Sequence, residues 1–98
     1  MVNLALIRRG QVASERLPTG RMIRAARALV GLDQAELARE IGVDRRTMMR
    51  IEAGIAPPTH PMRLATYRAI RDSLERRGVS FVYPGKSQGE GVTLKKVE

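Results

Sequence analysis

Two short stretches in the middle of the chain, each opened by an aspartate and closed by a glycine, limit its fold more than any other feature. Asp33 and Asp44 are helix-capping residues, and Gly42 and Gly54 are of the type that most often ends a helix. Apolar side chains recur at helical spacing within each stretch. The sequence therefore predicts two short helices joined by a turn of about three residues: 34–41 and 45–53.

Two longer helices are expected on either side of this pair. Thr19 and Gly31 bound a stretch of helical periodicity in which Arg27 falls on the apolar stripe. After a proline-rich connector, Pro61 suits the first position of a helix that continues with three- and four-residue apolar spacing until Gly78. The two predicted helices are 20–30 and 61–77.

The periodicity changes to alternation after Gly78, and the turn-forming run PGKSQGEG divides the alternating residues into two groups. The pattern predicts a short β-hairpin, which must pack on the long helix, pair with another strand, or both, because an isolated hairpin is only marginally stable. The expected fold class is mainly α with a C-terminal β extension. The predicted segments are an N-terminal arm (1–18), a helical domain (19–77) and the extension (78–98).

Composition narrows the class of partner. The chain has 98 residues, enough for a single small domain, and a net charge of +8 that favours a polyanion. Of its 18 basic residues 15 are Arg, which favours nucleic acid over a membrane surface. No cysteine is present, and no run approaches the roughly 20 apolar residues of a membrane span. The arginines follow the apolar start instead of preceding it, so we expect no secretory signal and a cytoplasmic, nucleoid-associated protein.

The helix predicted at 45–53 has two different faces. At about 100° per residue, Met48 and Ile51 fall on one side and face the core. Arg45, Arg46 and Arg50 fall on the opposite side, close to the helix start. A helix held by its neighbours with cations on its outer face fits the major groove of DNA.

The run QAELAREIGVDRRTMMRIEAG resembles the helix-turn-helix of the phage-repressor and Cro-like family, the XRE-type transcription regulators. The specific elements are Gln34 at the start of the first short helix, the spacing from Ala38 to Gly42, and the ending formed by Ile51, Glu52 and Gly54. The resemblance covers residues 20–77. It implies a compact four-helix domain of the lambda-repressor-like type that binds double-stranded DNA.

The resemblance also implies roles for individual residues. It makes Gln34 a phosphate contact that braces the next helix, places Thr47 at the helix edge near phosphate or methyl groups, and pairs Arg27 with Glu52 as scaffold. The positions that it assigns to base reading are Arg45, Arg46, Met49 and Arg50. Because Arg binds guanine with two hydrogen bonds, a half-site containing G is expected.

The C-terminal extension departs from the five-helix pattern of many family members, and it is the candidate for a dimer or partner interface. The residues expected to form that interface are Phe81, Tyr83, Val92 and Leu94. A homodimer would read both halves of a palindrome. Alternatively, the strands only cover the core of a monomer. The run Val2 to Ile7 is a candidate for an additional strand.

The expected function is a sequence-specific repressor of transcription. The alternative is an antitoxin or another protein that binds a partner through its C-terminal segment; RNA binding is less favoured because three scattered aromatic residues make no stacking platform. A plain alternative for the arginines is a solvated surface, and we expect that role for Arg68, Arg71, Arg76 and Arg77. His60 lies without metal-ligand partners, and no catalytic motif is present, so no enzyme activity, metal or cofactor is expected.

Overall fold

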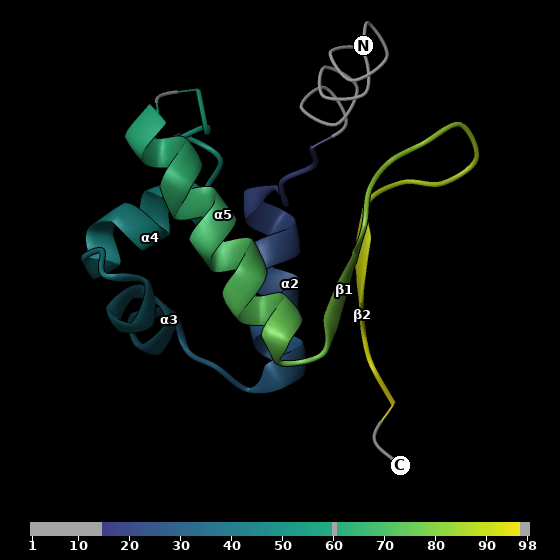
Figure 1. The fold of residues 1–98 in the computed structure, drawn as a ribbon, viewed down its shortest axis with the longest axis horizontal. Helices are drawn as coiled ribbons and strands as arrows, with labels where there is room; N and C mark the ends of the chain where they lie inside the picture. The colour runs from purple at the N-terminus through teal and green to yellow at the C-terminus, as the bar shows by residue number, and fades with distance from the viewer. Residues whose placement is uncertain (1–14, 60, 97–98) are drawn as a thin grey trace, which may run out of the picture.

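The computed structural model describes residues 15–59 and 61–96, and the predictions for Val2 to Ile7 and His60 lie outside them. The described elements are α2 (Gly20–Val30), α3 (Gln34–Ile41), α4 (Arg45–Glu52), α5 (Pro61–Arg76), β1 (Val79–Val82) and β2 (Gly91–Leu94). Helices α2 and α5 lie in the middle, with α3 and α4 on one side and the hairpin on the other (Figure 1). The predicted fold class, mainly helical with a C-terminal two-stranded antiparallel sheet, is confirmed.

The capping residues act as the sequence predicts. Thr19 and Asp44 each accept a hydrogen bond from the backbone N–H three residues later. Asp33 accepts one from Glu36 at 2.7 Å, and the Glu36 carboxylate accepts the Asp33 N–H in return at 2.9 Å. Gly42 ends α3 with φ of 90°, a left-handed conformation that glycine adopts without strain. The turn that joins α3 and α4 is therefore specified on both sides.

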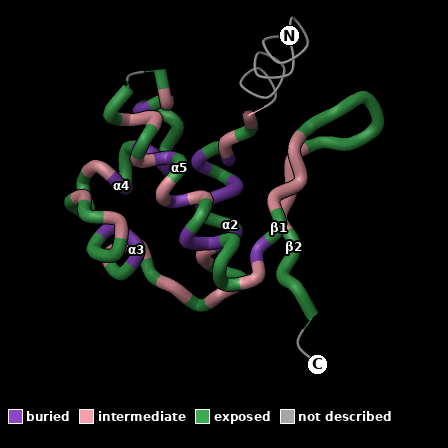
Figure 2. Tube along the Cα trace, in the orientation of Figure 1, coloured by how far each residue is buried: buried purple, intermediate pink, exposed green. Residues whose placement is uncertain are grey.

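A single apolar core joins all four helices and the first strand. Its buried residues occur on the helices and at the start of β1 (Figure 2). They are Ile23, Ala26, Leu37, Ala38, Met48, Ile51, Ala56, Tyr67, Ile70, Leu74 and Val79. Helix α4 is thus anchored by the two residues that its pattern assigned to the inner face, Met48 and Ile51.

The hairpin packs mainly on α2, where the sequence suggested the long helix. β1 contacts both α2 and α5. Besides pairing with β1, β2 lies along α2, and it has no comparable contact with another helix in the described part of the chain. Phe81 and Val92, opposite each other in the antiparallel register, are partly buried against the core. Glu90 reinforces this placement because its carboxylate accepts the Thr19 hydroxyl at 2.9 Å and the Arg21 guanidinium at 2.5 Å. The start of α2 is therefore tied to the start of β2.

Residues 15–18, which the sequence assigned to an arm, lie against the domain. Pro18 is fully buried, and the Tyr83 hydroxyl donates to the carbonyl of Arg16 at 3.2 Å. Glu15 accepts two 2.7 Å hydrogen bonds from Arg68 and a longer one from Arg71. Contrary to expectation, these two arginines of α5 hold another segment of the chain instead of serving only as solvated charges.

A second polar cluster joins α3 to α5. The Arg77 guanidinium donates to both oxygens of Glu40, at 2.5 and 3.0 Å, and to the Ser73 hydroxyl at 2.7 Å. Ser73 is fully buried and donates its own hydroxyl proton to Glu40. Arg77 too is therefore a structural residue, and α3 is held to α5 by charge as well as by apolar contact.

We expect acid to destabilise the protein between about pH 4.5 and pH 2. Hydrogen bonds from Arg68 and Arg77 lower the pKa of Glu15 and of Glu40, respectively, from 4.5 to about 2. The unfolded chain takes up these protons first, so the stabilisation is complete above pH 4.5 and is lost as pH falls toward 2. Urea unfolding across this range should show the decline. Glu40→Gln should make the decline shallower, with Glu15 still contributing, whereas Glu75→Gln, exposed on α5, should leave it unchanged.

The first turn of α2 meets the end of α4 backbone to backbone. A Cβ atom added at Gly20 would stand 2.5 Å from the carbonyl oxygens of both Ile51 and Glu52. Carbonyl groups of a helix cannot move aside as a flexible side chain can. Only glycine therefore permits this approach of the two helices.

Gly20→Ala should lower the free energy of unfolding by about 1–3 kcal/mol, because the methyl group forces α2 away from α4. This loss would occur although alanine favours helices more than glycine does. The matched control is Gly89→Ala, since nothing lies within 4 Å of a Cβ placed there. Equal stability of the two variants in chemical denaturation would contradict the close approach.

Candidate nucleic-acid interface

Helix α4 has a buried apolar face and an exposed face that carries its arginines, as its sequence predicts. Arg45, Arg46 and Arg50 are exposed, and Met49 among them is 50% exposed. Met48 on the inner face has no exposed surface. The structure thus brings the four predicted base-reading residues together on one outer surface.

The scaffold behind that surface is centred on the carboxylate of Glu52, the last residue of α4, whose side chain is only 2% exposed. Arg27 of α2 donates to its two oxygens from Nε at 2.6 Å and from Nη2 at 2.8 Å. The remaining guanidinium nitrogen of Arg27 donates to the carbonyl of Leu32 at 3.1 Å. Hydrogen bonding to Glu52 is the main cause that raises the pKa of Arg27 above its usual value. The predicted pair is present with the two-pronged geometry of a strong interaction.

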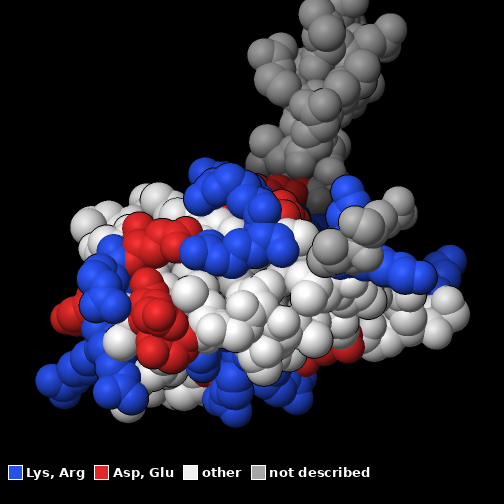
Figure 3. Space-filling view, turned by 90° about the horizontal axis from the view of Figure 1, so that it is seen from below, with Lys and Arg blue, Asp and Glu red and all other residues white. Residues whose placement is uncertain are grey.

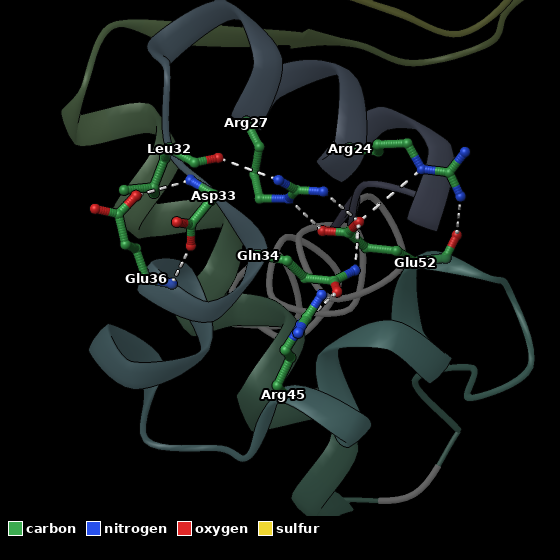
Figure 4. A network of polar contacts seen from close by, with 8 residues as sticks. All are labelled: Arg24, Arg27, Leu32, Asp33, Gln34, Glu36, Arg45 and Glu52. Carbon is green, nitrogen blue, oxygen red and sulfur yellow. Dashed lines mark hydrogen bonds and ion pairs between the residues drawn. The ribbon is translucent and has the colours of Figure 1, made fainter.

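Gln34 connects this buried pair to the outer surface. Its amide nitrogen donates to Glu52 at 3.1 Å, and its amide oxygen accepts from Nε of Arg45 at 3.4 Å (Figure 4). A continuous polar network therefore runs from α2 through α3 to the first exposed arginine of α4. Gln34 is half-buried, in the position expected of a residue that braces the next helix.

Thr47 stands at the edge of α4 and is half-buried. Its backbone N–H donates to Asp44, and this hydrogen bond is the main cause that lowers the pKa of that carboxyl. Thr47 also lines a groove of about 380 Å³. The other lining residues are Val43 and, from the first turns of α5, Met62, Arg63 and Thr66. The edge of α4 is therefore accessible beside an additional cation, Arg63, that the sequence pattern did not single out.

The charges on the surface are distributed unevenly. Figure 3 shows one face of the molecule in a space-filling view. Basic side chains lie around the rim of this face, acidic side chains lie beside some of them, and the centre of the face is uncharged. In residues 15–59 and 61–96, neither Arg46 nor Arg50 has an acidic side chain within 4 Å, so both are available to a ligand. No group of acidic, His or Cys side chains in these same ranges is arranged to hold a metal ion.

Residues 23–60, which span most of α2 and all of α3 and α4, match the protein family described as Helix-turn-helix. Residues 23–60 thus form a helix-turn-helix of the XRE type. Members of this family are DNA-binding transcription regulators, and the chain is a regulator of this general kind. A comparison with curated proteins gives no match. Within its described part, the chain has no helix whose length and apolar character suffice to span a membrane.

Arg24 is a structural neighbour of the XRE-type scaffold that sequence reasoning did not place. Its Nη2 donates to the carbonyl of Glu52 at 3.5 Å, and its Nε lies 4.0 Å from the carboxylate. Arg24 precedes Arg27 by three residues, so the two share one side of α2. The three-residue spacing is the sequence signal that could have identified Arg24 as a neighbour of Arg27.

Arg27→Met should cost about 3–5 kcal/mol of unfolding free energy, because it leaves the buried carboxylate of Glu52 without its main partner. Arg24→Met is the matched control: its side chain is 62% exposed, so we expect a loss below about 1 kcal/mol. Urea titrations of both variants test this. Similar losses would show that burial of Glu52 does not depend on Arg27.

Proposed function

We propose that the protein is a sequence-specific repressor that binds a palindromic operator in double-stranded DNA as a homodimer. The observation that carries the proposal is the outer face of α4. Three exposed arginines and one exposed methionine stand together on a helix whose orientation is fixed by the buried carboxylate of Glu52. A rigid helix with such a face satisfies the requirements for reading base edges in the major groove.

The proposal assigns a chemical role to each residue of this surface. Arg46 and Arg50 donate paired hydrogen bonds to guanine O6 and N7, and Arg45 does so from a side chain positioned by Gln34. Met49 contacts apolar groups such as the thymine methyl. Gln34 and Thr47 donate to phosphates on either side of α4 and set the register of the helix on the duplex.

The homodimer follows from the size of the reading surface. α4 has eight residues, and one such helix contacts only a few base pairs. Two heads about 34 Å apart reach successive major grooves on one side of the duplex, and together they recognise a site long enough to be selective. A bound dimer of this kind represses most simply by covering a promoter.

Selection of duplex DNA from a random pool should enrich a palindrome that contains G in each half-site. Arg46→Ala and Arg50→Ala should each relax the preference at one position per half-site, by about 5- to 150-fold, which corresponds to roughly 1–3 kcal/mol. The selections are run at one salt concentration, because phosphate contacts make affinity depend on salt.

The control is Arg76→Ala, which removes the same charge from the far end of α5, where the side chain is 70% exposed. It should leave the selected sequence unchanged. If Arg46→Ala and Arg50→Ala weaken binding no more than Arg76→Ala does and no sequence is enriched, the arginines of α4 contribute only general positive charge, and sequence-specific repression is refuted.

A further inference from the structure

The hydrogen-bond pattern of the hairpin determines which backbone groups of β2 point away from β1. The N–H of Lys95 donates to the carbonyl of Gly78 at 2.8 Å, in register with the pairing of Val79 and Leu94. In antiparallel strands hydrogen-bonded and non-hydrogen-bonded pairs alternate. The backbone N–H and C=O groups of Val92 and Leu94 therefore point outward, along the free edge of β2.

This edge is open and partly apolar. In the described ranges, no other backbone or side-chain group hydrogen-bonds to the main chain of Val92 or Leu94. Leu94 remains 41% exposed and Leu29 on α2 44% exposed. Leu29 is next to the last residue of α2 and Leu94 is the last residue of β2, and these two element ends lie toward the same end of the molecule (Figure 1). Unpaired edges of this kind bind another strand.

We propose that β2 pairs with β2 of a second copy of the chain, antiparallel and about a twofold axis at Thr93, to give a four-stranded sheet. The inference rests on the homodimer of the proposed function and specifies its interface. Val92 then faces Leu94 of the second copy, and the outward groups of the two residues form four hydrogen bonds across the axis. The exposed Leu94 gains an apolar neighbour on the face that packs against α2.

Charge complementarity supports this register and this occupant. With the axis at Thr93, Glu90 of one copy lies opposite Lys96 of the other, twice by symmetry. A shift by two residues in either direction places Lys96 opposite Val92 or Gln88 instead, and both ion pairs are lost. The pairing also leaves the reading surface free, because α4 and the hairpin lie on opposite sides of α2 and α5 (Figure 1).

The chain contains no cysteine, so disulfide trapping can test the pairing directly. Thr93 is exposed, and in the proposed dimer the two copies of Thr93 form a non-hydrogen-bonded pair with Cα atoms about 4.5 Å apart, within reach of a disulfide. Thr93→Cys, oxidised with glutathione, should run mainly as a covalent dimer on a non-reducing gel.

Ser80→Cys is the matched control. Ser80 is exposed opposite Thr93 on β1, and in the proposed sheet its two copies are three strand spacings apart, about 14 Å, too far for a disulfide. Cross-linking of Ser80→Cys in place of Thr93→Cys would move the interface to β1. Absence of cross-linking in both would overturn strand pairing between copies.

Charge reversal tests the register without a covalent bond. Glu90→Lys and Lys96→Glu should each weaken self-association about 5- to 10-fold in sedimentation equilibrium, whereas their equimolar mixture should restore it, because only the mixed dimer places opposite charges in both pairs. Glu90→Lys also removes the bonds of Glu90 to Thr19 and Arg21 of its own copy, so the circular dichroism of this variant is compared with that of the parent. A mixture that associates no better than either variant alone would refute the register. Trapping of Thr93→Cys together with a DNA selection that enriches no sequence would refute the repressor function and leave the strand pairing intact.

Discussion

The arrangement of the helices depends on the buried carboxylate of Glu52. Its negative charge is removed from water and lies at the negative end of the α4 dipole, so it is stable only with strong donors around it. Arg27 supplies two hydrogen bonds from α2, and Gln34 supplies one from α3. Because these donors must converge on one group, three helices have a fixed geometry that apolar packing alone would leave less specific.

Pairing with carboxylates also distinguishes the structural arginines from those that are available to a ligand. Glu15 binds Arg68 and Arg71, and Glu40 binds Arg77. In both cases the ion pairs join segments that are far apart in the sequence. The arginines on the outer face of α4 have no such acidic partner in the described part of the chain. The net charge of +8 is therefore not spread evenly, and part of it remains uncompensated where a helix can enter a groove of DNA.

Local patterns were sufficient to predict the helices and the two faces of α4, because caps and helical periodicity act over three or four residues. The Arg27 and Glu52 pair came from the family resemblance, and composition gave no indication of it. The contacts of Glu15 with Arg68 and of Glu40 with Arg77 join residues 53 and 37 positions apart. Nothing in local spacing encodes such pairs, so Arg68, Arg71 and Arg77, which look like solvated charges in the sequence, are structural. The packing of the hairpin on α2 also depends on contacts between residues far apart in the sequence, which local patterns do not encode.

Helix α2 is the element that relates the two ends of the molecule. One side contacts α4 through Arg27 and through the close backbone approach at Gly20, and the other supports the hairpin through Thr19, Arg21 and Glu90. The 11-residue helix is thus held by contacts on both faces. A dimer formed through β2 would therefore fix the separation and angle of the two α4 helices through α2. The spacing of operator half-sites would then be set by the packing of α2, and not by the residues that read the bases.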